Sequence, residues 1–268
     1  MRTLSLLFPG RVVTSMAACE QFARVVADDA EHRRLLAEVQ QFRGRIALEE
    51  NAINPWQLTL DGRHVQPADD RGIHLVGTDC AGKVVSCMRY LPHANTTHWT
   101  DLRVFYTPLA SDAQWRPVLE EAIGAEMARA RQLNYSYVEM GGWVIVEELR
   151  HSIEAARMVA TAYALARFFG GALGITTATT KHGSSSILRR LGGSSLCAFG
   201  KELPPYFDPQ YQCEMEILRF DSSQPGKRCA QAVQHCEELL MQMPVILPEP
   251  VRPLLPSLAD LCAATVSA

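Results

Sequence analysis

The stretch "YSYVEMGGWVIVEELRHSIEAAR", residues 135–157, decides the fold that we predict for this chain. It begins with β-branched and aromatic residues, which favour a strand, and it ends in an Ala- and Glu-rich segment, which favours a helix over 153–169. A second short strand, "LGITTAT" (173–179), follows that helix. A strand, a helix and a strand in such close succession predict a crossover unit with parallel strands, usually right-handed.

The residues before this unit predict a helical segment, a hairpin and a further helix. Residues 15–43 contain no proline and carry apolar side chains at roughly helical spacing, which predicts one or two helices. The segment "GIHLVGTDCAGKVVSCMRYLPH" (72–93) contains two extended runs, 73–78 and 83–90, on either side of a turn. Residues 112–132 have apolar side chains at i, i+3 and i+4 and predict an amphipathic helix.

The residues after the unit predict two helices and a strand. The segment "SSSILRRL" (184–191) predicts a helix that stops at the glycine pair following it. In "YQCEMEILRF" (211–220) apolar and polar residues alternate, as in a strand with one solvent-exposed face. We expect a helix over 228–242, and then an extended strap or tail in "MPVILPEPVRPLLPS" (243–257).

Together these elements predict an α/β (α+β) fold, in which a central mixed and twisted sheet is flanked by helices. Of the 268 residues, 47% are hydrophobic and 21% are charged, which is an ordinary globular composition compatible with one large domain. We expect the core of the fold to occupy 1–221, with the C-terminal helix and proline-rich strap of 222–268 packed on it.

The bulk properties disfavour several classes of function. A formal net charge of -3 and the lack of a basic run disfavour a nucleic-acid partner. No apolar stretch has membrane-spanning length, and the opening "MRTLSLLFPG" is too short for a secretory signal, so we expect a cytoplasmic protein. The eight cysteines form no C-x-x-C pair and are interpreted as reduced, mostly buried thiols. The histidines show no metal-binding spacing, and we assign no metal site.

The junction between the central strand and its helix carries polar residues that are typical of an anion site. The first turn of a helix has unpaired N–H groups and the positive end of the helix dipole, so it attracts phosphate. Arg150 would strengthen such a site. In the alternative interpretation, Ser152 only caps the helix and Arg150 is a solvated surface residue. The two interpretations are compatible, because a capped helix start can still hold phosphate.

The central strand and the segments on either side of it carry further candidate residues. Glu139 precedes Gly141 and Gly142, and glycines inside a strand often mark a bulge or the close approach of a ligand. A glutamate beside such a bulge could act as a base, although a glutamate in a strand more often faces solvent. Arg89 could guide an anionic substrate or be an exposed residue at a strand end, and His182 could cap a turn or touch a ligand.

The order of these elements resembles the GNAT acyltransferase superfamily. Its phosphate loop has Gln or Arg at the first position, Gly at the fourth and Gly or Ala at the sixth. Arg150 and Ala155 match the first and last of these positions, whereas Ile153 stands where the family usually has Gly. Residues 40–222 resemble the branch that holds long-chain N-acyl amino acid synthases and acyl-homoserine-lactone synthases. The resembling segments are "QQFRGRIALEE" (40–50), "GKVVSCMRYLPH" (82–93), "VEMGGWVIV" (138–146), "KHGSSSILRRLGG" (181–193) and "PYFDPQYQCEMEILRFDS" (205–222).

The resemblance implies a GNAT-like sheet and a division of roles among the candidate residues. Glu139 would be the catalytic base, and the strand backbone at Gly141 and Gly142 would hold the tetrahedral intermediate. The phosphopantetheine arm of the donor would be bound by Arg150, His151, Ser152 and Ala155. The acceptor substrate would be bound by Arg43, Arg89, His182 and Ser184.

The implied activity is N-acyl transfer from acyl carrier protein or acyl-CoA to an amine. Lactone synthases have Arg three residues after the strand glutamate, where this chain has Gly142, so the α-amine of an amino acid is the favoured acceptor and a long chain the favoured acyl group. We expect no permanently bound cofactor. Two alternatives stay open. One is a small-acyl, acetyl-CoA-dependent enzyme, and the other is a non-catalytic acyl-binding or partner-binding domain, which Ile153 and Gly142 would favour. A deep apolar channel beside the strand would favour long acyl chains.

Overall fold

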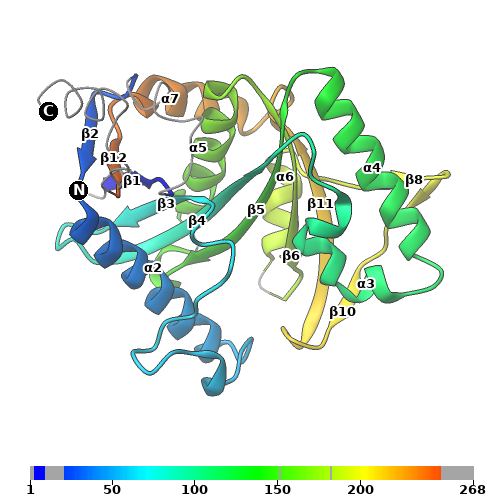
Figure 1. Ribbon diagram of the computed structural model, residues 1–268, viewed down its shortest axis with the longest axis horizontal. Helices are drawn as coiled ribbons and strands as arrows, with labels where there is room; N and C mark the ends of the chain where they lie inside the picture. Colours follow the sequence, from blue (N-terminus) through cyan, green and yellow to red (C-terminus); the bar gives the residue numbers. More distant parts are fainter. Residues whose placement is uncertain (1–2, 10–20, 151, 182, 249–268) are drawn as a thin grey trace, which may run out of the picture.

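A computed structural model describes residues 3–9, 21–150, 152–181 and 183–248. In this part of the chain, ten strands form one mixed sheet in the order β10-β11-β6-β5-β4-β3-β1-β12-β2, with β7 paired to β11 (Figure 1). The strands of this sheet are β1 (Thr3–Leu7), β2 (Arg24–Ala27), β3 (Ile73–Thr78), β4 (Val84–His93), β5 (Ser136–Ile145), β6 (Ala172–Thr179), β7 (Ser194–Ser195), β10 (Tyr206–Asp208), β11 (Cys213–Asp221) and β12 (Pro244–Leu247). Strands β8 (Cys197–Ala198) and β9 (Lys201–Glu202) form a separate pair.

Helices cover both faces of this sheet (Figure 1). The α-helices are α2 (Asp29–Glu49), α3 (Pro108–Ser111), α4 (Arg116–Gln132), α5 (Glu154–Phe168), α6 (Ser184–Arg190) and α7 (Ala230–Leu240). The short 3-10 helices are η1 (Pro55–Gln57), η2 (Trp99–Asp101), η3 (Arg103–Tyr106) and η4 (Glu147–Leu149). Helices α5, α6 and α7 pack on one face, and α2 and α4 pack on the other. The predicted α/β fold with a central mixed sheet flanked by helices is therefore confirmed.

Side-chain alternation along β5 explains how one strand serves both faces. Val138 packs in the core beneath α5, whereas its neighbour Tyr137 packs beneath α4. Successive side chains of a strand point to opposite faces, so a strand buried on both sides needs apolar residues at nearly every position. The run that the sequence predicts as a strand meets this requirement. Helix α5 is likewise apolar around most of its circumference, because α7 covers its outer side.

The crossover predicted from residues 135–157 is present. Strands β5 and β6 are parallel, with Ser136 paired to Ala172, and α5 connects them. The connection depends on Gly171, whose φ is 110° and whose missing Cβ would lie 2.3 Å from the Tyr135 ring. Only glycine adopts this conformation without strain and leaves room for the ring.

A β-bulge interrupts β5 at the glycine pair. The register between β4 and β5 shifts between Cys87 and Arg89, so one extra residue of β5 is inserted there. Gly142 adopts a φ of 58°, in the left-handed region that favours glycine. The extra residue reverses the alternation beyond it. Trp143 consequently packs on the α5 face with Met140, and Val144 packs on the α2 face.

Strands β5 and β6 separate immediately before the bulge. Their pairing ends at Met140 and Thr176, although both strands are described to their ends, β5 to Ile145 and β6 to Thr179. The backbone groups of β5 that follow Met140 therefore have no partner on β6, in this described part of the sheet. Such an opening in a central sheet exposes strand backbone to a ligand.

Two local predictions differ from the structure because distant strands determine them. The segment 15–43 was predicted as helix. Residues 10–20 lie outside the described part, and Arg24–Ala27 forms β2 before α2 begins. Asp28 caps α2 by accepting a hydrogen bond from the Glu31 amide at 3.0 Å. The segment 243–257 was predicted as a strap, but Pro244–Leu247 forms β12 between β1 and β2.

Three features are absent from the part of the chain that the structure describes. Its helices include none that is long and apolar enough to cross a membrane. It contains no group of three or more side chains placed to hold a metal ion. Its six cysteines are free thiols, of which Cys87, Cys229 and Cys236 are buried, whereas Cys80 and Cys197 are exposed.

Replacing Leu165 with Ala should lower the free energy of unfolding by roughly 2–5 kcal/mol, because this α5 side chain is completely buried beneath the sheet and its removal leaves a cavity. Urea unfolding followed by circular dichroism would measure the change. The matched control is Leu60→Ala, at an exposed position, which should stay within about 0.5 kcal/mol of wild type. Equal losses in the two variants would contradict the packing described for α5.

Candidate active site

Three cavities meet where β5 and β6 separate. An apolar chamber of about 560 Å³ lies on the α5 face. A polar cavity of about 1450 Å³ lies on the α2 and α4 face. A cleft of about 1480 Å³, here called the joint cleft, follows the connection between β5 and α5. Trp143 lines all three, so its side chain stands at their junction.

The apolar chamber extends from the strand opening into the core. Small residues on its walls, Ala162 and Ala166 of α5 and Gly174 of β6, leave the space that larger side chains would fill. Its remaining lining is almost entirely carbon and comes from Met88, Tyr90, Val138, Met140, Gly141, Trp143, Val159, Tyr163, Ala172, Thr176, Leu188, Phe220 and Ser222. A chamber with this lining suits an apolar ligand.

Glu139 lies on the opposite face of β5 and lines the polar cavity. The bulge lies beyond it, so it keeps the same face as Tyr137. Its carboxylate is buried, and its oxygen Oε2 lies 2.9 Å from His93 Nε2. The amide of Val104 donates to the other oxygen, Oε1, at 3.3 Å. The structure thus excludes the interpretation of Glu139 as a solvent-facing strand residue.

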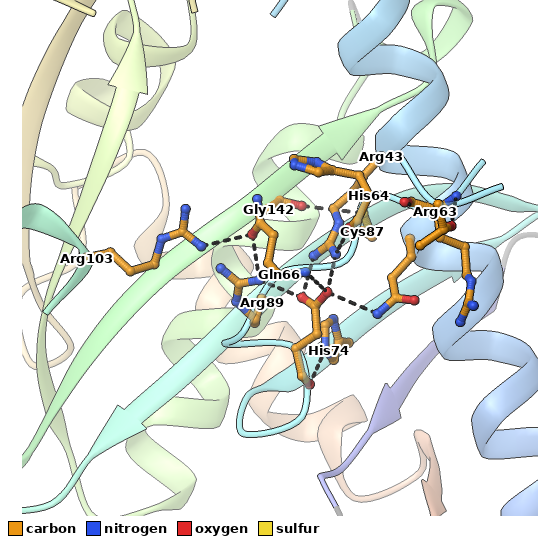
Figure 2. Close-up of polar contacts among 12 residues, drawn as sticks. Arg43, Arg63, His64, Gln66, His74, Cys87, Arg89, Arg103 and Gly142 are labelled. Atoms are coloured by element: carbon orange, nitrogen blue, oxygen red, sulfur yellow. Dashed lines mark hydrogen bonds and ion pairs between the residues drawn. The ribbon is translucent and has the colours of Figure 1, made fainter. Parts of the chain in front are cut away.

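Arg43 and Arg89, both labelled in Figure 2, share one buried carboxylate, that of Asp69. Arg43, from α2, donates to both oxygens of Asp69 at 2.9 and 2.6 Å. Arg89, from β4, donates to Oδ1 at 2.6 Å and to Gln66 Oε1 at 2.9 Å. Arg103 donates to the same Gln66 oxygen. Arg89 was considered as an exposed strand-end residue, but only 2% of it is exposed.

The cluster carries one positive charge in excess, because two guanidinium groups face a single carboxylate. Burial alone would raise the pKa of Asp69, but the hydrogen bonds and charge of Arg43 and the charge of Arg89 hold it well below its usual range. Burial disfavours the charged form of Arg89 and lowers its pKa to about 10, against the pull of Asp69. At neutral pH the cluster therefore adds fixed positive charge to the wall of the polar cavity, whose lining also includes Glu139 and Asp208.

The glycine pair makes room for these guanidinium groups. A Cβ at Gly142 would lie 3.1 Å from Arg43 Nη1, and one at Gly141 would lie 3.4 Å from Arg89 Nη2. The thiol of Cys87 donates to the carbonyl oxygen of Gly142 at 3.4 Å and so contacts the bulge as well. The two glycines thus let the cations pack directly against the strand backbone.

The polar residues at the start of α5 are held by contacts with other parts of the chain. Arg150 forms an ion pair with Glu50, the residue that follows α2, and both residues line the joint cleft. The hydroxyl of Ser152 donates to the Leu149 carbonyl at 2.7 Å and accepts from the Glu154 amide at 3.1 Å, as a capping residue does. The Glu154 carboxylate turns into the core, where it accepts from the Ser86 hydroxyl at 2.6 Å, so it does not occupy the anion site.

The strand opening brings together most of the residues that the sequence singled out. Those that line the polar cavity are Arg43, Arg89, Glu139, Gly141, Gly142 and Ser184. Arg150 and Ala155 line the joint cleft, which Ser184 also reaches. His151 and His182 lie outside the described residues.

Sequence reasoning missed three residues of this region: Asp69, His93 and Trp143. Asp69 stands in a turn-rich segment that offered no pattern. His93 ends the predicted hairpin, and its place diagonal to the strand glutamate could have been found by pairing the two strands. Simple alternation along β5 would have placed Trp143 on the same face as Glu139, whereas the bulge reverses the alternation.

The sequence and the structure were compared with those of known proteins. No protein-family model and no curated protein sequence matches the chain. Among solved structures, the CoA-dependent acyl-homoserine lactone synthase BjaI, with SAM and isopentyl-CoA, is 16% identical, with 90% of this chain and 97% of BjaI covered and a TM-score of 0.51. The chain has a GNAT-like fold.

Two further structures share this GNAT-like fold. TofI, in a ternary complex with an inhibitor and MTA, is 17% identical, with 87% of this chain and 96% of TofI covered and a TM-score of 0.50. The CoA-dependent acyl-homoserine lactone synthase MesI is 13% identical, with 88% and 95% covered and a TM-score of 0.50. At these identities the likeness concerns the fold alone, and the chemistry has to be argued from the site.

Replacing Asp69 with Asn should lower the free energy of unfolding by roughly 3–5 kcal/mol, because two buried guanidinium groups lose their counter-charge. The folded-state pKa of Asp69 lies below its unfolded value of about 3.9, so its contribution is present above that pH and is lost as the pH falls further. The difference between wild type and variant should therefore shrink below about pH 4. Urea unfolding across pH 3–7 would measure it.

The matched control for this change is Asp29→Asn, which breaks an exposed ion pair with Arg33 on α2. Exposed pairs contribute about 0–1 kcal/mol, so this variant should be nearly as stable as wild type. An Asp69→Asn protein that unfolds with the wild-type free energy at pH 7 would contradict the role given to the cluster.

Proposed function

We propose that this protein is an N-acyltransferase, which transfers a long-chain acyl group from a phosphopantetheine thioester to the α-amine of an amino acid. The observation that carries this proposal is the opening between β5 and β6, which has an apolar chamber on one face and the buried carboxylate of Glu139 on the other. A thioester carbon held in the opening would lie between a site for its acyl chain and a site for the amine.

The apolar chamber supports a long acyl group. Its lining on β6 runs from Thr176 back to Ala172, which is about 13 Å at roughly 3.3 Å per residue. An extended chain with bonds of about 1.5 Å would place roughly ten carbons in this length. Each buried methylene contributes about 0.8 kcal/mol, so a long chain gains binding energy that an acetyl group lacks. A small-acyl activity is correspondingly disfavoured.

The polar cavity supports an acceptor with a carboxylate. The excess positive charge of the Arg43, Arg89 and Asp69 cluster faces it, and Arg103 adds a further guanidinium group at its wall. An amino acid bound by its carboxylate on this side would direct its amine towards Glu139. Because Arg43 and Arg89 already bind Asp69, they would act chiefly through their field, and Arg103 is the better candidate for direct contact.

The reaction requires a base and stabilisation of an oxyanion. A free α-amine has a pKa of about 8, so at neutral pH it must lose a proton before it attacks. Glu139 would take that proton. The amine nitrogen would then bond to the thioester carbon, and N–H groups of β5 beyond Met140, at Gly141 and Gly142, would stabilise the oxyanion. Collapse of the intermediate breaks the carbon–sulfur bond, and the second proton lost by the nitrogen passes to the sulfur, which leaves as the thiol.

The joint cleft is the proposed site of the pantetheine arm. It opens on the start of α5, where Arg150, Ala155, Lys181 and Ser184 line it. Ser152 caps the helix and would leave the later amides of the first turn to a phosphate group. Acyl-CoA and acyl carrier protein carry the same phosphopantetheine arm, and either would fit this role.

Incubation of the protein with acyl-CoA thioesters of two to sixteen carbons and the twenty amino acids, followed by mass spectrometry, tests the proposal. We expect N-acyl amino acids with chains of roughly eight to twelve carbons, because the chamber accepts about ten. The same series on acyl carrier protein would distinguish the donors. Acetyl transfer alone would favour the small-acyl alternative, and no transfer from either donor would favour a non-catalytic binding domain.

Glu139→Gln should reduce turnover about 10²- to 10⁴-fold at neutral pH, because the amide cannot accept the proton of the amine. The KM for the acyl thioester should change little, since Glu139 lies on the acceptor side. Steady-state kinetics with free-thiol detection would measure both constants. The matched control is Glu238→Gln on the exposed surface of α7, and retention of wild-type turnover in Glu139→Gln would rule out the assigned base.

A further inference from the structure

His93 is the last residue of β4 and lies beside the proposed base. In the antiparallel register of β4 and β5, Leu91 is opposite Glu139 and His93 is opposite Tyr137. His93 and Glu139 are therefore diagonal neighbours on one face of the sheet. Their atoms Nε2 and Oε2 are 2.9 Å apart, and only 6% and 8% of the two side chains are exposed. This is a buried, directed contact inside the site.

The chemistry of the pair identifies the hydrogen-bond donor. A carboxylate in its base form only accepts hydrogen bonds, so the hydrogen in this contact belongs to His93 Nε2. A neutral His93 is then the tautomer that is protonated at Nε2, with Nδ1 unprotonated. The ring cannot take a second proton at Nε2, and it therefore acts on Glu139 by donating to it.

The two oxygens of Glu139 are held unequally. Oε2 receives the short hydrogen bond from His93, whereas Oε1 receives a longer one, of 3.3 Å, from the Val104 amide. A shorter hydrogen bond to an ionised acceptor is the stronger one and withdraws more charge from its oxygen. Oε1 thus keeps the more available lone pair.

We propose that His93 is a positioning residue that fixes the carboxylate of Glu139 through Oε2 and leaves Oε1 as the atom that accepts the proton of the amine. The contact itself is independent of the reaction, but this assignment of roles rests on the proposed acyl transfer. One N–H bond of the ammonium breaks and one O–H bond forms at Oε1. Oε2 of the neutral acid still accepts from His93, and the proton leaves to solvent after the amide product departs.

The other titratable or charged groups around Glu139 stay constant when His93 is replaced. They are Tyr137 on β5 and, around the polar cavity, Arg43, His64, Arg89, Arg103, Tyr106, Tyr206, Asp208 and Tyr211. Their charges set the background for the ionisation of Glu139. A change in the pH dependence of the His93 variants therefore reports the lost donor.

Two substitutions separate the hydrogen bond from the bulk of the ring. His93→Leu removes the donor, and His93→Gln keeps an N–H group at a similar distance along the side chain. Without a donor to its charged form, a carboxylate becomes harder to ionise. The acid limb of the kcat profile should therefore move upward by about one pH unit in His93→Leu, which is about a tenfold loss of kcat below the limb. Above the limb, kcat should recover.

In His93→Gln the acid limb should stay close to that of wild type, and in both variants the KM for the acyl thioester should be unchanged. The matched control is His235→Leu, at an exposed position of α7, which should leave the whole profile unchanged. A loss of kcat in His93→Leu that is the same at every pH would overturn the positioning role, as would an unshifted limb.

A measurement on the free protein separates this inference from the proposed function. Long-range ¹⁵N NMR of histidine-labelled protein reports which ring nitrogen of His93 is protonated, with His93→Gln identifying the signal. We expect protonation at Nε2, and its resonance should shift in Glu139→Gln. Protonation at Nδ1 alone would overturn the inference. If the protein transferred no acyl group while the NMR result held, the proposed function would fail and the contact would stand.

Discussion

The bulge at Gly142 is the constraint on which the arrangement of the site depends. One extra residue in β5 reverses the alternation of side chains, so Glu139 faces α4 and the polar cavity while Trp143 faces α5 and the apolar chamber. An unbroken strand would put both residues on one face. The separation of β5 from β6 begins immediately before the bulge, at the Met140–Thr176 pair, so the same few residues open the sheet and divide the two cavities.

The buried arginines around Asp69 pack against the two glycines of the bulge. Guanidinium groups rarely pack against strand backbone, because a side chain normally occupies that space; here the two glycines leave it free. Burying Arg43 and Arg89 is costly, and their shared carboxylate offsets that cost only because the hydrogen bonds are short and numerous. The result is a rigid, positively charged cluster in the wall of the proposed acceptor site. The site therefore combines strand backbone that is unpaired to β6 with a fixed electrostatic field.

The sequence predicted the features that local patterns determine. The hairpin of β3 and β4, the crossover through α5 and the amphipathic helix α4 all have periodic apolar residues over most of their length, and their positions agree with the structure within a few residues. Glu139 and the glycine pair were found because glycine inside a strand is unusual. Residues such as Asp69 were missed because a carboxylate in a loop carries no sign of the two cations that it meets in three dimensions.

Strands β1, β2 and β12, which were not predicted, affect the order in which the chain can fold. Leu6 of β1 pairs with Val245 of β12, and Val25 of β2 pairs with the same residue from the other side. This edge of the sheet joins the two ends of the described chain. The residues that pair there are separated by nearly the whole length of the sequence. On a ribosome, β1 could pair with β3 early, but β2 would wait for its neighbour until β12 had emerged. Among the described strands, the one synthesised last thus completes a sheet edge whose other strands were made first.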